Sequence, residues 1–183
     1  MIDLFLFLSY FLFMKQHELP IINLKFLKKK SLLVIISNSV KGGDNYLFRN
    51  VYAKDKNGKE VDILEDGKNS CAAFVSWILL AVGLIKKPHA TVEGTEKDLI
   101  NSGWFEIKEP KPGAILIWEK AMDDDKLLGE YTLMRRHIGF YTGDDSAISN
   151  DSKGKGFPWK HHFTYNNTRK IEKILWHLDL DNG

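Results

Sequence analysis

The sequence is poor in cysteine and in net charge, and both shortages exclude classes of protein. Among its 183 residues there is a single cysteine, Cys71. Neither an internal disulfide nor a zinc site made of several cysteines can therefore form. Lysine and arginine number 26 against 24 aspartate and glutamate residues, which gives a net charge of +2. A field this weak argues against nucleic acid as a partner.

The sequence also lacks an apolar run long enough for a typical membrane-spanning helix. The run at residues 2–14 (IDLFLFLSYFLFM) has about 13 residues, whereas a spanning helix needs about 20. Its length suits a signal peptide, but no basic residue precedes it and no small-residue cleavage site follows. A packing helix and an extension outside the fold are the alternatives. The run favours a secreted or cell-envelope location over a cytoplasmic one, and membrane contact through residues 2–14 stays open.

What is present is the composition of one globular domain. Hydrophobic residues make up 44% of the sequence, aromatic residues 12% and charged residues 27%, which is enough apolar material for a core. The length suits one domain of ordinary size. We expect an apolar and basic extension over residues 1–30 and a single domain over residues 31–183, and the oligomeric state is left open.

Helical patterns occupy the first half of this domain. Residues 31–40 have the apolar spacing of a helix, and residues 71–85 are apolar around most of the helical circumference. The second pattern predicts a central helix buried on more than one side. Ser70 is a residue type that caps helices, which places Cys71 in the first turn. Trp77, further along this helix, is assigned to the core.

A second helix is predicted to begin at Thr95, and strand patterns follow it. Short apolar runs at residues 114–118, 137–141, 146–149 and 170–178 are separated by turn residues and predict neighbouring antiparallel strands. Because the helices come first and the sheet second, the order indicates an α+β fold rather than alternating βαβ units.

Cys71 and His137 are the residues whose placement favours catalysis. Cysteine reacts as the thiolate, and the free N–H groups and positive dipole of a first helical turn favour that anion. His137 begins a predicted strand, which would hold its ring firmly enough for a general base. The alternatives are an inert buried thiol and a solvated histidine. A third polar group must fix the imidazole tautomer, and Ser149, Asn150 and Asp151 follow at the end of the next strand.

Three segments resemble motifs of the NlpC/P60 and CHAP families, which belong to the papain-like cysteine peptidase superfamily. Residues 69–75 (NSCAAFV) resemble the segment that carries the nucleophile, and residues 112–118 (PGAILIW) resemble the Pro-Gly-Asp strand. Residues 137–143 (HIGFYTG) resemble the element that carries the base. Their order and spacing match as well, within residues 44–180.

The resemblance implies a papain-like fold, in which a helix carrying the cysteine packs on an antiparallel sheet. It also implies hydrolysis of amide bonds in peptidoglycan peptides, with Cys71 as nucleophile, His137 as base and no cofactor. The family's third residue falls twelve places after the histidine, at Ser149. Because serine orients an imidazole poorly, we predict Asn150 in this role, with Asp151 as second choice.

Two departures from the family pattern concern the substrate. The common Asp-Cys-Ser-Gly is here SCAA at residues 70–73, and the acidic residue of Pro-Gly-Asp is Ala114. In such enzymes the missing carboxylate helps to recognise a free amino end of the substrate. We expect substrate contacts from Ser70, Ser149 and His162. His161 and His162 are adjacent, so on a strand they point to opposite faces, and we expect no metal site.

The residues leave two further interpretations open. An acyltransferase would use the same thiol but pass the acyl group to an acceptor other than water. A catalytically silent binding domain would keep the scaffold alone, and the departures at Ser70 and Ala114 favour this interpretation.

Overall fold

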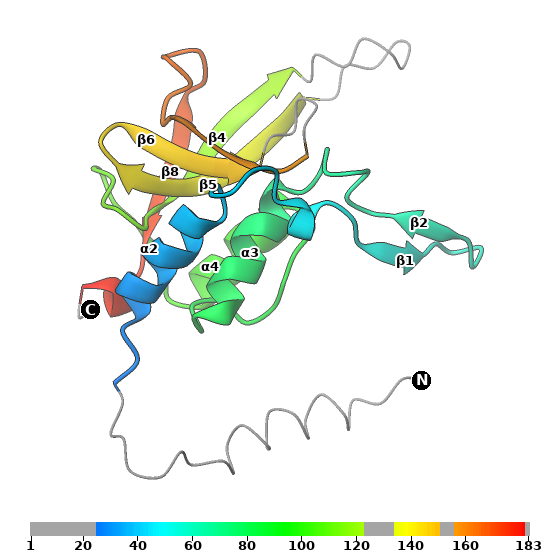
Figure 1. Cartoon of the computed structure of the whole chain (residues 1–183), viewed down its shortest axis with the longest axis horizontal. Coiled ribbons are helices and arrows are strands. Elements are labelled where there is room, and N and C mark those ends of the chain that lie inside the picture. Colours follow the sequence, from blue (N-terminus) through cyan, green and yellow to red (C-terminus); the bar gives the residue numbers. More distant parts are fainter. Residues whose placement is uncertain (1–24, 123–133, 151–155, 182–183) are drawn as a thin grey trace.

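The computed structural model describes residues 25–122, 134–150 and 156–181, and it confirms the α+β class. Helices α2 (Lys28–Asn38), α3 (Cys71–Ala81) and α4 (Val92–Asn101) lie on one face of an antiparallel sheet (Figure 1). The apolar run at residues 2–14 is outside the described residues. Within them, no helix combines the length and apolarity needed to cross a bilayer.

The main sheet has six strands in the order β3, β8, β4, β5, β6, β7. All of its pairings are antiparallel. The bounds are β3 (Phe105–Glu106), β4 (Ile115–Met122), β5 (Met134–Gly143), β6 (Ser146–Asn150), β7 (Pro158–His162) and β8 (Ile171–Trp176). The strands predicted from the sequence correspond to β4, β5, β6 and β8, whereas β3 and β7 were not predicted. A separate hairpin, β1 (Tyr52–Lys54) and β2 (Glu60–Asp62), extends away from the sheet (Figure 1).

The two faces of the sheet bury different side chains, because successive residues of a strand point to opposite sides. Ile138 and Phe140 of β5 belong to the main core, together with the helices. Trp118 belongs to a smaller cluster on the other face, which also includes Phe163 and Tyr165 from the turn between β7 and β8. His137 and Trp118 are direct partners across β5 and β4. The histidine therefore belongs to the face away from the helices.

Helix α3 is the centre of the main core. Its residues Phe74, Val75 and Leu79 are fully buried, and the helix contacts both β5 and β6. Phe74 packs edge-on against Phe140, with ring centroids 5.7 Å apart. Removing such a ring costs about 3–5 kcal/mol in comparable cores. Trp77 is 45% exposed, so its assignment to the core was wrong: it lies on the outer face of the helix.

Helix α4 begins earlier than the sequence predicted. Thr91 has an extended backbone conformation, and its side chain accepts a hydrogen bond from the N–H of Gly94, so it is the N-cap residue. Thr95, the predicted start, lies inside the helix. Its hydroxyl donates to the carbonyl oxygen of Thr91 over 2.8 Å, a bond that a residue within a helix can make.

Helix α2 crosses the predicted boundary between residues 30 and 31. It begins at Lys28, and its residues Leu32 and Ile36 are buried in the main core. Lys28 pairs with Asp179 near the end of the chain. The helix thus joins the described start of the chain to the domain rather than preceding it.

Gly67 lies in the turn between β2 and α3, where two backbones meet. Its φ is +90°, and a Cβ at this position would come 2.7 Å from the carbonyl oxygen of Gly156. Because this contact is between backbones, no side-chain rotation can relieve it. The turn that leads into Cys71 therefore has a fixed position against the segment just before β7.

We expect Gly67→Ala to destabilise the protein more than Gly58→Ala. Gly58 has a similar φ of +80° but no atom within 4 Å of a built Cβ. Both changes place alanine in the left-handed region, at a cost of about 1 kcal/mol. Gly67→Ala adds the collision with Gly156, worth about 1–3 kcal/mol more. Urea unfolding of both variants measures the difference, and equal losses would contradict the close contact.

Candidate active site

Cys71 is the first residue of α3, as the sequence predicted, and its thiol is buried. Burial raises the pKa of this thiol, because the thiolate would lose its hydration. The backbone N–H groups of Ile138 and Ala72 act in the opposite direction, together with the positive charge of Arg169. Burial is the larger effect, so the first helical turn does not by itself produce a thiolate.

The first turn of α3 keeps its backbone N–H groups uncapped. Ser70 occupies the N-cap position but makes no capping hydrogen bond. Its hydroxyl instead donates to the carbonyl oxygen of Gly67 over 2.5 Å and accepts from the Asn150 amide. The first intrahelical bond at this end runs from the N–H of Phe74 to the carbonyl oxygen of Ser70, over 2.8 Å. The N–H groups before it have no partner within the helix.

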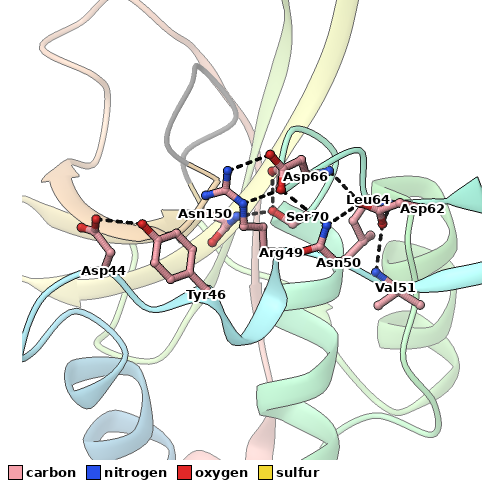
Figure 2. Close-up of polar contacts among 11 residues, drawn as sticks. Asp44, Tyr46, Arg49, Asn50, Val51, Asp62, Leu64, Asp66, Ser70 and Asn150 are labelled. Atoms are coloured by element: carbon pink, nitrogen blue, oxygen red, sulfur yellow. Dashed lines mark hydrogen bonds and ion pairs between the residues drawn. The ribbon is translucent and has the colours of Figure 1, made fainter.

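The loop before α3 is held by two carboxylates (Figure 2). Arg49 donates to both oxygens of Asp66, over 2.6 and 2.8 Å. Arg49 thereby lowers the pKa of Asp66 to about 2. Asp62 accepts from the Asn50 side chain over 2.7 Å and from the backbone N–H of Asp66 over 2.8 Å. Since Asp66 has a φ of +57°, an unusual conformation for this residue, these contacts fix the turn that leads to Cys71.

His137 is buried in an aromatic pocket on the other face of the sheet. Its ring centroid lies 5.5 Å from that of Trp118, and its Nε2 is 2.9 Å from the Oγ of Ser149. Burial holds the pKa of the imidazole well below its ordinary value, and the positive charge of Arg169 acts in the same direction, as does His161 whenever its ring is protonated. The resting imidazole is therefore neutral at pH 7.

Ser149 is the centre of a small polar network. Besides His137, its hydroxyl contacts His161 Nε2 over 2.9 Å and the Tyr165 hydroxyl over 3.1 Å. The rings of His161 and Tyr165 are stacked, with centroids 4.1 Å apart. Ser149 is fully buried, so these contacts are shielded from solvent.

Gly139 makes room for this network. It lies beside Ser149 on the neighbouring strand, and a Cβ on Gly139 would come 2.7 Å from the Cβ of Ser149. The same Cβ would be 3.1 Å from the indole ring of Trp118. The glycine of the His-Ile-Gly segment thus lets the serine approach the imidazole.

The third position differs from the sequence prediction. Asn150 does not contact His137, because it points to the helical face of the sheet and donates to Ser70. Ser149, one residue earlier, points to the face of the imidazole and bonds it. Asp151, the second choice, lies outside the described residues. Among the described residues, the buried Oδ1 of Asn150 has no hydrogen-bond partner.

His161, rather than His162, belongs to the network. The Nδ1 of His162 accepts from the Thr164 hydroxyl over 2.9 Å and takes part in the turn after β7. A substrate contact of His162 stays a prediction, whereas the contact with Ser149 is made by His161. Strand pairing decides the matter: Trp159 is opposite Ser149, so His161, two residues later, shares that face.

The thiol and the imidazole approach the same stretch of β5 without a direct bond. The sulfur is beside the N–H of Ile138, the residue that follows His137. Within the described parts of the chain, Ser149 is the only hydrogen-bond partner of the imidazole. In those parts no group of three or more histidine, cysteine or acidic side chains is arranged to hold a metal ion. The structure therefore places a buried thiol on the helical face of β5 and a neutral imidazole on its other face.

Comparison with models of known protein families gives no match, and comparison with curated proteins likewise gives none.

We expect the acid side of the stability profile to depend on His137. Its pKa is lowered on folding, so the unfolded chain takes up this proton at a higher pH than the folded protein does. Stability should therefore fall as the pH drops below 6.5, the ordinary value for this group, by up to about 1.4 kcal/mol per pH unit. Chemical unfolding between pH 5 and 8 should give a flatter curve for His137→Gln. Parallel curves would contradict the buried neutral imidazole.

We expect the alkaline side to depend on Cys71. Its pKa is raised on folding, so the unfolded chain loses this proton first and stability should fall as the pH rises above 9.0. Cys71→Ala should flatten this decline and leave the acid side as in the parent protein. The two variants control for each other, because each should change one side of the profile only. An unchanged alkaline decline in Cys71→Ala would show that other groups cause it.

Proposed function

We propose that this protein is a thiol hydrolase that cleaves amide bonds, with Cys71 as nucleophile and His137 as base. The observation that carries the proposal is the thiol at the first residue of a buried helix, beside the N–H that follows a tethered, neutral imidazole. A neutral imidazole is the form able to take a proton from a thiol. The motifs at residues 69–75, 112–118 and 137–143 support a papain-like enzyme of the NlpC/P60 or CHAP kind.

The reaction begins with transfer of the thiol proton from Cys71 to His137. The sulfur attacks the carbonyl carbon of the substrate, and the carbonyl π electrons move to its oxygen. His137 then gives its proton to the leaving nitrogen as the C–N bond breaks, which leaves a thioester on Cys71. Water attacks the thioester, and a carboxylic acid and the free thiol result. At rest the thiol and the imidazole lie on opposite faces of β5 without a hydrogen bond between them, so the proposal requires substrate binding to change the position of at least one of them.

The uncapped first turn of α3 suits the negatively charged intermediate. The N–H of Cys71 belongs to this turn. The hydroxyl of Ser70, which as a cap would accept from the N–H of Ala72 or Ala73, is engaged by Gly67 and Asn150 instead. Backbone N–H groups held in advance at such a position stabilise an oxyanion without reorganising. This supports acyl chemistry on the sulfur more than simple packing of a cysteine does.

The substrate class we propose is the peptide part of peptidoglycan, which would place the protein outside the cytoplasmic membrane. The support is the sequence resemblance. Ser70 stands where related enzymes have a carboxylate for a free amino end, so we propose that this chain does not require one. Trp159, 39% exposed and next to His161 in the aromatic pocket, offers a surface for a substrate group.

A catalytically silent domain is the second candidate, and one observation favours it. Burial raises the pKa of Cys71, and the described residues include no hydrogen bond between this thiol and His137. A protein that kept only the scaffold would have these properties. Such a protein would release no product from any peptide, whatever the pH.

We expect Cys71→Ala and His137→Ala each to lower the turnover of a peptidoglycan digest by a factor of about 1,000 or more. Both groups take part in bond formation or proton transfer, so neither loss can be compensated by binding. New carboxyl and amino ends, quantified by mass spectrometry, measure the activity. Circular dichroism establishes that each variant is folded.

Trp77→Ala is the matched control, because Trp77 is exposed on the same helix and away from the core. It should retain the parent activity. Retained turnover in Cys71→Ala would contradict the proposal, and absence of turnover in the parent protein would favour the catalytically silent domain. An added amine acceptor separates hydrolysis from acyl transfer: a new amide in place of the free acid would identify a transferase.

A further inference from the structure

The hydroxyl of Ser149 has three partners, and counting protons determines how they are arranged. A serine hydroxyl donates one hydrogen bond and accepts two. Its partners are His137 Nε2, His161 Nε2 and the Tyr165 hydroxyl, at 2.9, 2.9 and 3.1 Å. One of these contacts is therefore donated by the serine and the other two are accepted.

The other nitrogen of His161 decides which contact is donated. Its Nδ1 lies 2.8 Å from the carbonyl oxygen of His162. A carbonyl oxygen only accepts, so Nδ1 carries the proton, and in a neutral ring Nε2 is then an acceptor. With His161 neutral, the hydroxyl of Ser149 must donate to its Nε2. It then accepts from Tyr165 and from Nε2–H of His137.

We infer that His161 is a positioning residue that acts through Ser149 to hold His137 in the tautomer protonated at Nε2. Nδ1 of His137 is then left unprotonated, as the proposed proton transfer from Cys71 requires. The inference rests on the proposed function for its purpose, but the proton arrangement is a property of the resting protein. Ser149 alone could not fix the tautomer of His137, because a hydroxyl without His161 as acceptor can donate to the imidazole as readily as it accepts from it.

The surroundings of His161 keep this arrangement rigid. Its ring is stacked on Tyr165, and the ring of Trp159 lies 4.9 Å away on centroids. His161 itself is 9% exposed, so water has little access to the bond with Ser149. An aromatic ring without a nitrogen would preserve this stacking and remove only the acceptor.

The test is to determine the tautomer of His137 by nitrogen-15 NMR of the ring at pH 8, above the ordinary imidazole pKa of about 6.5. In the parent protein we expect the proton on Nε2. In His161→Phe the proton of Ser149 becomes free to turn toward His137. The proton of His137 should therefore move to Nδ1, with at least about a tenfold change in the tautomer ratio. His161→Gln should restore the parent state, because its carbonyl oxygen accepts from Ser149.

Tyr165→Phe is the matched control. It removes one donor to Ser149 but leaves His161 as acceptor, so the tautomer should stay as in the parent protein. A parent His137 protonated at Nδ1, or a His161→Phe variant with an unchanged tautomer, would overturn the inference. A purely structural role of His161 would change stability without moving the proton.

Turnover of the peptidoglycan digest separates this inference from the proposed function. If both hold, His161→Phe lowers kcat by at least about tenfold with little change in KM, and His161→Gln recovers most of the loss. If the tautomer shifts as expected but the parent protein cleaves nothing, the proton arrangement stands and the hydrolase proposal fails.

Discussion

The hydrogen bond between His137 and Ser149 is the constraint on which the arrangement of this site depends. A buried neutral imidazole without a partner would lose about 1–3 kcal/mol relative to water. The bond joins β5 to β6 on the face away from the helices, where Trp118 and Tyr165 exclude solvent. It therefore satisfies the imidazole and fixes the direction of its ring at the same time.

The residue next to Ser149 fixes the other half of the site. Asn150 points to the helical face and donates to Ser70, the residue before Cys71. Two neighbouring side chains of β6 thus hold the imidazole on one face and the helix start on the other. Because strand geometry fixes their relation, the position of the sulfur along β5 is coupled to the orientation of the ring.

The sequence predicted the parts that depend on local patterns. The start of the central helix at Cys71, the strand that carries His137 and the helices-then-sheet order all followed from periodicity and turn residues. The role of His161 did not, because it depends on the register of β7 against β6, which no local pattern contains. Asn150 was preferred to Ser149 on side-chain chemistry alone. In the structure, Ser149 points toward His137 and Asn150 points toward Ser70 on the opposite face.

Arg136, the residue before His137, limits how this part of the protein can vary. It donates to Glu96 of α4 over 2.6 Å and to Glu172 of β8 over 2.7 Å, and Lys173 also pairs with Glu96. A slip of β5 by one residue would bring this guanidinium into the aromatic pocket and the imidazole among the charges. Replacement of Glu96 alone would leave two cations facing each other. Among related sequences, substitutions at these four positions should therefore occur together. Sequences that keep the register of β5 should keep equal numbers of positive and negative side chains there.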